Sequence, residues 1–149
     1  YGITPDVFST AKGLCAGLPL GATVLGEKVE NVLGYGDNGS TFGGNPICCA
    51  GAISTLSRMD EALLAEVQAK SQYTVESLTG AKGVKAVSGL GLLLGIAPER
   101  DCATVINECI EAGVLVLSAH GKVRLLPALN IPMEQLQKAV EILRDVLAR

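Results

Sequence analysis

The sequence predicts a mixed α/β fold in two regions, because its composition changes along the chain and helical and strand-like patterns alternate after that change. Roughly the first 57 residues are rich in glycine and other small residues, whereas the remainder alternates amphipathic helical patterns with short apolar runs. Hydrophobic residues make up 48% of the 149 residues, which is ample for a core. We therefore expect a first region over residues 1–57, a connecting helix over 58–80 and a small α+β domain over 81–149.

In the first region the sequence predicts one strand and one helix. Residues 1–10 are rich in turn-forming residues, whereas residues 22–26 form a β-prone run. Asn45-Pro46 marks the start of a helix over residues 47–56, since proline suits the first helical turn. Because residues 47–56 carry no charge, we expect this helix to be buried on all sides.

The rest of the chain predicts three helices and three strands. The expected helices cover residues 60–78, 101–111 and 132–149, and the expected strands cover 84–96, 114–117 and 123–126. Gly80 is a suitable stop for the first of these helices, and Asp101 is a suitable N-cap for the second. Together the elements after residue 80 predict a βαββα layer in which helices cover one face of a small sheet.

Charge and composition argue against several classes of partner. The net charge is -3, with no tryptophan and few other aromatic residues, so we expect no nucleic-acid partner. No uncharged apolar run approaches the roughly 18 residues of a membrane span, so we expect no membrane partner. The first residues lack the basic and apolar pattern of a signal peptide, and the absence of an initial methionine suggests a truncated or processed chain.

The five cysteines are an odd number, and they form no Cys-x-x-Cys pair. They also show no metal-ligand spacing with the single histidine, His120, so we expect no metal site and treat His120 as a loop residue. Free thiols are typical of a reducing compartment, and we therefore expect a cytoplasmic protein.

Lys12 is the strongest candidate for chemistry, in the glycine-rich run STAKGLCAGLPLGA over residues 9–22. No acidic residue lies within five positions of Lys12 on either side to stabilise an ammonium ion. We expect desolvation in such a loop to favour the free amine, which can then attack an aldehyde. Taken alone, an Ala-Lys-Gly tripeptide is more often a lysine at the mouth of a helix with its charged end in water.

Two further sites carry polar groups of interest. Ser40 and Thr41 lie among Gly39, Gly43 and Gly44, a composition that lets backbone amides approach an anion but that also favours a simple turn. Arg124 lies in an apolar, β-prone run, where a guanidinium is costly unless it faces water or a carboxylate. An arginine on an edge strand would explain the same pattern.

Several of these runs together resemble one protein family. The Lys12 run resembles the pyridoxal-phosphate lysine segment of the class III (ω-) aminotransferases, and TFGGNP over residues 41–46 resembles their phosphate loop. The resemblance continues, in family order, through GLGLLLGI at 89–96, AGVLVL at 112–117 and VRLLPALNI at 123–131. Within this family the likeness is strongest to acetylornithine and ornithine aminotransferases.

The resemblance implies a fold and a set of site residues. The chain would be the C-terminal part of a fold type I transferase, comprising the end of the large α/β domain and a small domain. Lys12 would hold pyridoxal 5'-phosphate and move the substrate proton, and Ser40 and Thr41 would bind the cofactor phosphate. In the family this threonine binds the cofactor phosphate of the neighbouring subunit. The resemblance therefore implies a homodimer with composite active sites. Arg124 would pair with a substrate carboxylate.

The resemblance also implies an activity and shows where this sequence departs from the family. The expected reaction moves the terminal amine of N-acetylornithine to 2-oxoglutarate, in arginine biosynthesis. The alternatives are an aminotransferase acting on ornithine or succinylornithine, a glutamate-semialdehyde aminomutase, and a non-catalytic fragment.

This sequence departs from the family pattern at two positions. Asn38 stands where the family often has a histidine, and Ala128 stands where it usually has a second proline. The cofactor-binding groups that the family keeps further upstream are absent, so we expect the isolated chain to be inactive.

Overall fold

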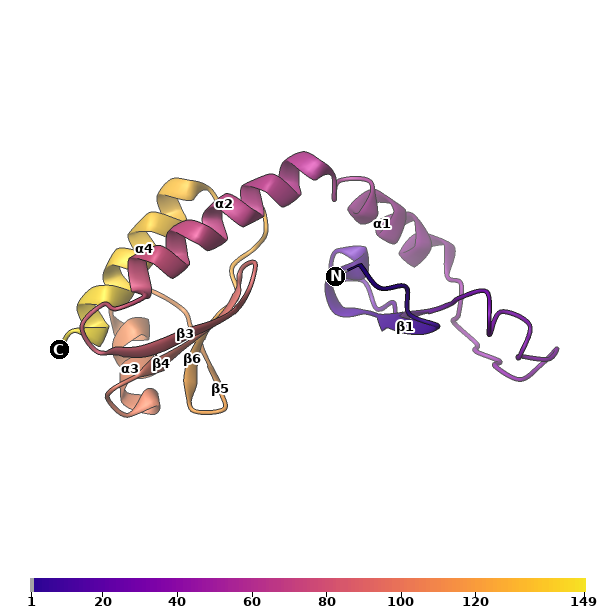
Figure 1. The fold of residues 1–149 in the computed structure, drawn as a ribbon. Helices are drawn as coiled ribbons and strands as arrows, with labels where there is room; N and C mark the ends of the chain where they lie inside the picture. Colours follow the sequence, from indigo (N-terminus) through magenta and orange to yellow (C-terminus); the bar gives the residue numbers. More distant parts are fainter. Residues whose placement is uncertain (1) are drawn as a thin grey trace. The chain divides into compact units, whose positions relative to one another are not determined.

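The computed structural model describes residues 2–149 and is mixed α/β (Figure 1). The chain forms two compact units, a first unit that ends at Asp60 and a second unit over Glu61–Arg149. Tyr1 lies outside the described residues, so the expectation for residues 1–10 is tested only from Gly2 onwards.

A two-stranded hairpin and one helix form the first unit. Strand β1 (Val7–Thr10) pairs antiparallel with β2 (Ala22–Leu25), with Val7 opposite Leu25 and Thr10 opposite Ala22. The strand expected over residues 22–26 is therefore confirmed. The expectation of turns throughout residues 2–10 is wrong at β1, because this strand is stabilised by a partner well downstream in the sequence.

Helix α1 (Pro46–Leu56) begins where the sequence predicts. The Asn45 side-chain oxygen accepts hydrogen bonds from the backbone N–H groups of Ile47 at 3.0 Å and Cys48 at 3.2 Å, which caps the helix. The expectation of burial on all sides is wrong, since Ile47 and Ile53 are 71% and 69% exposed. Only one side of α1 packs within this unit, against the segment that contains Cys15.

The second unit contains three helices and a four-stranded sheet. In chain order its elements are α2 (Glu61–Leu78), β3 (Val84–Leu90), β4 (Leu93–Pro98), α3 (Cys102–Glu111), β5 (Leu117–Ala119), β6 (Lys122–Leu125) and α4 (Met133–Leu147). The strand order is β3-β4-β6-β5, and every neighbouring pair is antiparallel. Helices α2 and α4 pack side by side (Figure 1).

The core of the second unit lies between the helices and one face of the sheet. Ile96 of β4 and Val123 of β6 are fully buried against residues of all three helices, such as Leu78, Val105 and Leu143. Because side chains alternate along a strand, the neighbours of Ile96 and Val123 lie on the opposite, open face of the sheet. This open face carries the polar residues of interest.

Two strand predictions in this unit are wrong in detail. The single strand expected over residues 84–96 is the hairpin β3–β4, with Gly91 at a φ of 58° in the turn, so the observed order is ββαββα. The strand expected at 114–117 is shifted to β5, because only Leu117–Ala119 pair with β6. The helices expected at 60–78, 101–111 and 132–149 and the strand at 123–126 are confirmed with ends shifted by at most two residues.

Candidate active site

Lys12 lies two residues after the end of β1 and begins a short 3-10 turn, Lys12–Cys15. Its φ is 55°, a left-handed conformation that residues with a β-carbon seldom adopt. Within residues 2–149, the other non-glycine residues with positive φ are Ala16 and His120. Backbone strain of this kind persists only where the surroundings impose it, and it concentrates at functional sites. The conformation therefore marks Lys12 as a functional candidate independently of its sequence motif.

Cys15 anchors the lysine turn. Its side chain is 1% exposed, packs with Cys48 and Ala52 of α1, and donates a hydrogen bond from Sγ to the Leu18 carbonyl oxygen at 2.7 Å. Burial raises the pKa of the Cys15 thiol, and the neighbouring Cys48 raises it further. Cys15 is therefore a neutral packing residue, as its surroundings in the sequence suggest, and it is no candidate nucleophile.

The Lys12 side chain is exposed in this unit. No acceptor or carboxylate among residues 2–149 pairs with its ammonium group. The sequence predicts that the Lys12 amine is removed from water, but the described residues leave it exposed. What the first unit supplies is an accessible primary amine on a strained backbone.

Ser40 and Thr41 lie in the exposed loop that leads into α1. A β-carbon at Gly43 would approach Ser40 Cβ to 2.9 Å, and Gly44 has a φ of 67°, so both glycines are required by the shape of this loop. The loop and the lysine turn meet the same end of α1, because Asn45 caps the helix and Cys48 packs on Cys15. No hydrogen bond joins Lys12 to Ser40 or Thr41.

Arg124 lies in the second unit, on the open face of β6, opposite Leu117 of β5 and Gly95 of β4. The alternative of an edge-strand arginine is wrong, because β6 lies between β4 and β5. Its Nε atom is buried, yet no group among residues 2–149 accepts a hydrogen bond from it. A buried donor without an acceptor is costly, which makes Arg124 a candidate for binding an external acceptor.

A hollow of about 240 Å³ lies beside Arg124 on the open face of the sheet. Lys122 also lines this hollow, and sequence reasoning missed it. The signal that could have found Lys122 is its spacing of two residues from Arg124, which places both side chains on one face of a strand.

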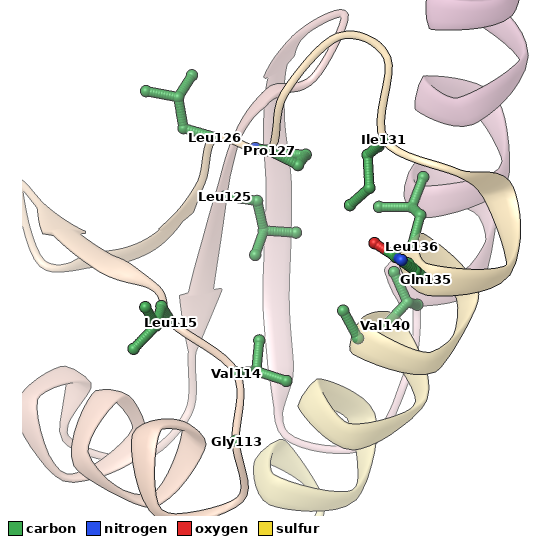
Figure 2. Close-up of a pocket in the computed structure, with 11 residues that line it drawn as sticks. Gly113, Val114, Leu115, Leu125, Leu126, Pro127, Ile131, Gln135, Leu136 and Val140 are labelled. Carbon is green, nitrogen blue, oxygen red and sulfur yellow. The ribbon is translucent and has the colours of Figure 1, made fainter.

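A second hollow of about 290 Å³ lies between α4, β6 and the segment after α3. Figure 2 shows Leu125, Ile131, Leu136 and Val140 around it, with Gln135 as the polar side chain. No charged side chain lines this hollow, so it offers no cation to pair with the carboxylate of an amino acid. Among the described residues, no cluster of metal-ligating side chains is present, and no helix is long and apolar enough to cross a membrane.

Comparison with known sequences places the chain among transferases. The family model described as aminotransferase class-III matches residues 1–147. The chain is 42% identical over 150 residues to an acetylornithine aminotransferase of Haemophilus ducreyi, covering 99% of this chain and 38% of that protein. It is 39% identical over 155 residues to a mitochondrial acetylornithine aminotransferase of Alnus glutinosa, covering 99% of this chain and 34% of that protein.

Solved structures give the same result. An ornithine aminotransferase of Toxoplasma gondii ME49 superimposes with a TM-score of 0.89 at 29% identity, covering 98% of this chain and 37% of that one. An acetylornithine aminotransferase of Elizabethkingia anophelis gives a TM-score of 0.87 at 29% identity, covering 98% and 39%. The chain thus spans well under half the length of the relatives it matches, and its fold corresponds to part of theirs. On the match over residues 1–147, the chain belongs to the class-III aminotransferase family.

Proposed function

We propose that the protein containing this chain is an aminotransferase that moves the terminal amine of N-acetylornithine to 2-oxoglutarate. The observation that carries the proposal is Lys12, an accessible amine in a left-handed backbone conformation, within a chain that matches the family over residues 1–147. The names of the related acetylornithine aminotransferases support this amine donor.

The residues of the first unit fit the cofactor of this family, pyridoxal 5'-phosphate. Lys12 offers a primary amine without a competing partner among residues 2–149, and Ser40 and Thr41 offer hydroxyl donors beside glycines with open backbone. When bound, the cofactor supplies the electron sink for the carbanionic chemistry of transamination.

Lys12 has two roles in this proposal. Its Nζ atom would hold the cofactor through the cofactor's aldehyde group, for which the neutral amine is required. With substrate in the site, Nζ would accept and return the substrate proton as a general base and acid. The strained turn at Lys12, anchored through Cys15, keeps the amine in a defined place for both roles.

The Ser40–Thr41 loop supports a composite site. Both side chains are exposed in this chain, and the loop is shaped by Gly43 and Gly44 rather than by contacts of the two hydroxyl groups. We propose that Ser40 and Thr41 donate hydrogen bonds to the cofactor phosphate of a neighbouring subunit. The protein would then be a homodimer in which each site is completed by the other copy.

Arg124 is the proposed carboxylate-binding residue. Its guanidinium presents a planar fork of donors that matches a carboxylate, and its Nε is unpaired among the described residues. The amino-acid donor and the keto-acid acceptor both carry such a carboxylate. Arg124 would therefore orient each of them in turn.

Two further expectations remain proposals for the full-length protein. Residues 1–57 would belong to the large cofactor-binding domain, 58–80 would form the connecting helix, and 81–149 would form the small domain. All five cysteines are free within the described chain, which supports a reducing compartment such as the cytoplasm.

The test is borohydride reduction of the full-length protein loaded with the cofactor, followed by peptide mapping. We expect a pyridoxyl group on Lys12 and none on Lys28, an exposed lysine of the same unit that pairs with Asp6. A pyridoxyl group on another lysine, with Lys12 unmodified, would refute the assignment. Rates with N-acetylornithine, ornithine and succinylornithine then decide the donor. Ornithine is the second candidate, since several matching structures are ornithine aminotransferases.

A further inference from the structure

Lys122 and Arg124 lie on the same open face of β6. They are two residues apart on one strand, and Val123 between them is fully buried on the helix-covered face. Residues at this spacing have α-carbons about 6.6–6.8 Å apart and side chains that leave the sheet in the same direction. Both side chains therefore leave the sheet on the same face, and both line one hollow.

Gly95 makes room for Lys122 beside Arg124. Gly95 is the register partner of Arg124, and a β-carbon there would lie 3.2 Å from Lys122 Cδ. The Lys122 stem therefore crosses the sheet over Gly95 instead of extending into solvent. A side chain at position 95 would push it away from this path.

Ser88 fixes the end of the Lys122 side chain. Lys122 Nζ donates a hydrogen bond to Ser88 Oγ at 2.8 Å, and Ser88 is the register partner of Gly95. Ser88 Oγ in turn donates to the Gly95 carbonyl oxygen at 3.3 Å. The ammonium group is thus oriented by a neutral hydroxyl, which leaves its charge uncompensated.

The hollow beside these residues is built for an anion. Its polar lining consists of Ser88, His120, Lys122 and Arg124, and no aspartate or glutamate contributes to it. Arg124 Nε has no acceptor among residues 2–149. Holding two adjacent cations without a counter-charge is unfavourable, and a ligand with two negative groups would relieve it.

We propose that Lys122 determines specificity for a dicarboxylate acceptor, by binding the second carboxylate of a molecule whose first carboxylate is bound by Arg124. The proposal rests on the proposed function, in which Arg124 binds a substrate carboxylate. The carboxyl carbons of a five-carbon dicarboxylate are separated by four bonds of about 1.5 Å, or about 5 Å when extended. Two long side chains that start two residues apart on a strand can reach both groups.

The test measures binding without turnover in the full-length, cofactor-loaded protein. The probes are glutarate, an unreactive dicarboxylate, and butyrate, which has a single carboxylate, with calorimetry as readout. We expect Lys122→Met to weaken glutarate binding about tenfold to a hundredfold, as for one lost charge-assisted hydrogen bond, and butyrate binding less than about twofold. Lys122→Arg should retain most of the preference for glutarate.

Two variants complete the design. Lys138→Met removes a lysine from the exposed side of α4, outside the hollow, and should leave the affinity for both probes unchanged. Ser88→Ala removes only the hydroxyl that orients the ammonium group, and should weaken glutarate binding by a smaller factor than Lys122→Met does.

Unchanged glutarate affinity in Lys122→Met would overturn the proposal. Equal losses of affinity for glutarate and butyrate would also overturn it. Such a result would indicate a general effect on the fold or on the electrostatic field, which does not distinguish one carboxylate from two. Failure of the proposed function would look different. Amine transfer from N-acetylornithine would be absent. The protein would still bind glutarate more tightly than butyrate, and this difference would still depend on Lys122.

Discussion

Cys15 is buried against Cys48, and this contact joins the lysine turn to the first turns of α1. Because Asn45 caps the same helix, both the Lys12 turn and the Ser40–Thr41 loop depend on where α1 begins. A capping residue and a buried thiol thus position two segments that carry the candidate chemistry.

The buried thiols predict a loss of stability at alkaline pH. Burial raises the pKa of Cys15 and of Cys109, so the folded chain keeps thiol protons that the unfolded chain loses above the ordinary thiol pKa. The unfolded state then binds fewer protons, and the free energy of unfolding falls as pH rises through that range. Urea unfolding of the chain at pH 7 and pH 9.5 measures this, and the Cys15→Ala, Cys109→Ala double variant should show a shallower decrease. Equal slopes would contradict the prediction.

Lys12→Ala should abolish most amine transfer in the full-length protein. Loss of the group that moves the substrate proton costs about a hundredfold to ten-thousandfold in rate. The single-turnover rate with N-acetylornithine is the appropriate measurement, and Lys28→Ala is the matched control because Lys28 is an exposed lysine of the same unit. A Lys12→Ala protein that retains the wild-type rate would exclude this role.

Arg124→Lys should weaken acceptor binding. Lysine keeps the charge but loses the planar fork of the guanidinium, so the KM for 2-oxoglutarate should rise about tenfold to a hundredfold. Arg144→Lys, on an exposed part of α4, should leave the KM unchanged. Unchanged kinetics of Arg124→Lys toward 2-oxoglutarate would show that Arg124 does not bind it.

Two glycines test the packing of the second unit. Gly83 and Gly113 have similar positive φ values of 81° and 90°, but a β-carbon at Gly83 would overlap the Leu147 carbonyl oxygen, whereas nothing lies within 4 Å of one at Gly113. Gly113→Ala should cost about 1–2 kcal/mol in the free energy of unfolding, from conformation alone. Gly83→Ala should cost about 3 kcal/mol or more, since α4 must also move. Chemical unfolding followed by circular dichroism measures both, and equal losses would argue against the close contact.

The features that the sequence predicts well are local ones. The start of α1 follows from Asn45-Pro46, and the start of α3 follows from Asp101, which accepts a hydrogen bond from the Thr104 N–H. Strand β1 could not be predicted in the same way, because its partner β2 lies beyond the lysine turn. The β3–β4 turn was hidden within an apolar run, since Leu92 beside Gly91 is itself buried in the core.

The same distinction applies to the candidate site. Lys12 was found from its glycine-rich motif, but its left-handed φ and the support of Cys15 depend on packing with α1, a helix more than thirty residues downstream. Lys122 was missed because the predicted strand began at Val123, one residue too late. The hydrogen bond between Lys122 and Ser88 depends on the strand order of the sheet, which no local sequence pattern specifies.

The isolated chain of 149 residues should fold at least over residues 63–149 and show no aminotransferase activity. The second unit has a continuous core, in which Leu78, Ile96, Val123 and Leu143 are fully buried. The first unit has a small core around Cys15 and leaves large apolar side chains exposed, such as Phe42 at 82% and Ile47 at 71%. Exposed apolar surface of this kind promotes self-association.

Lys12 of the isolated chain is solvent-exposed, and no other described residue pairs with its amine. The chain spans 38% of the length of its Haemophilus ducreyi relative. In the proposed function, groups outside residues 1–149 would complete the cofactor site. We therefore expect the chain alone to bind pyridoxal phosphate only weakly through Lys12. The measurement is cofactor absorbance after dialysis, together with turnover of N-acetylornithine by the purified chain. Retention of one cofactor per chain, or measurable amine transfer, would show that residues 1–149 are sufficient for catalysis.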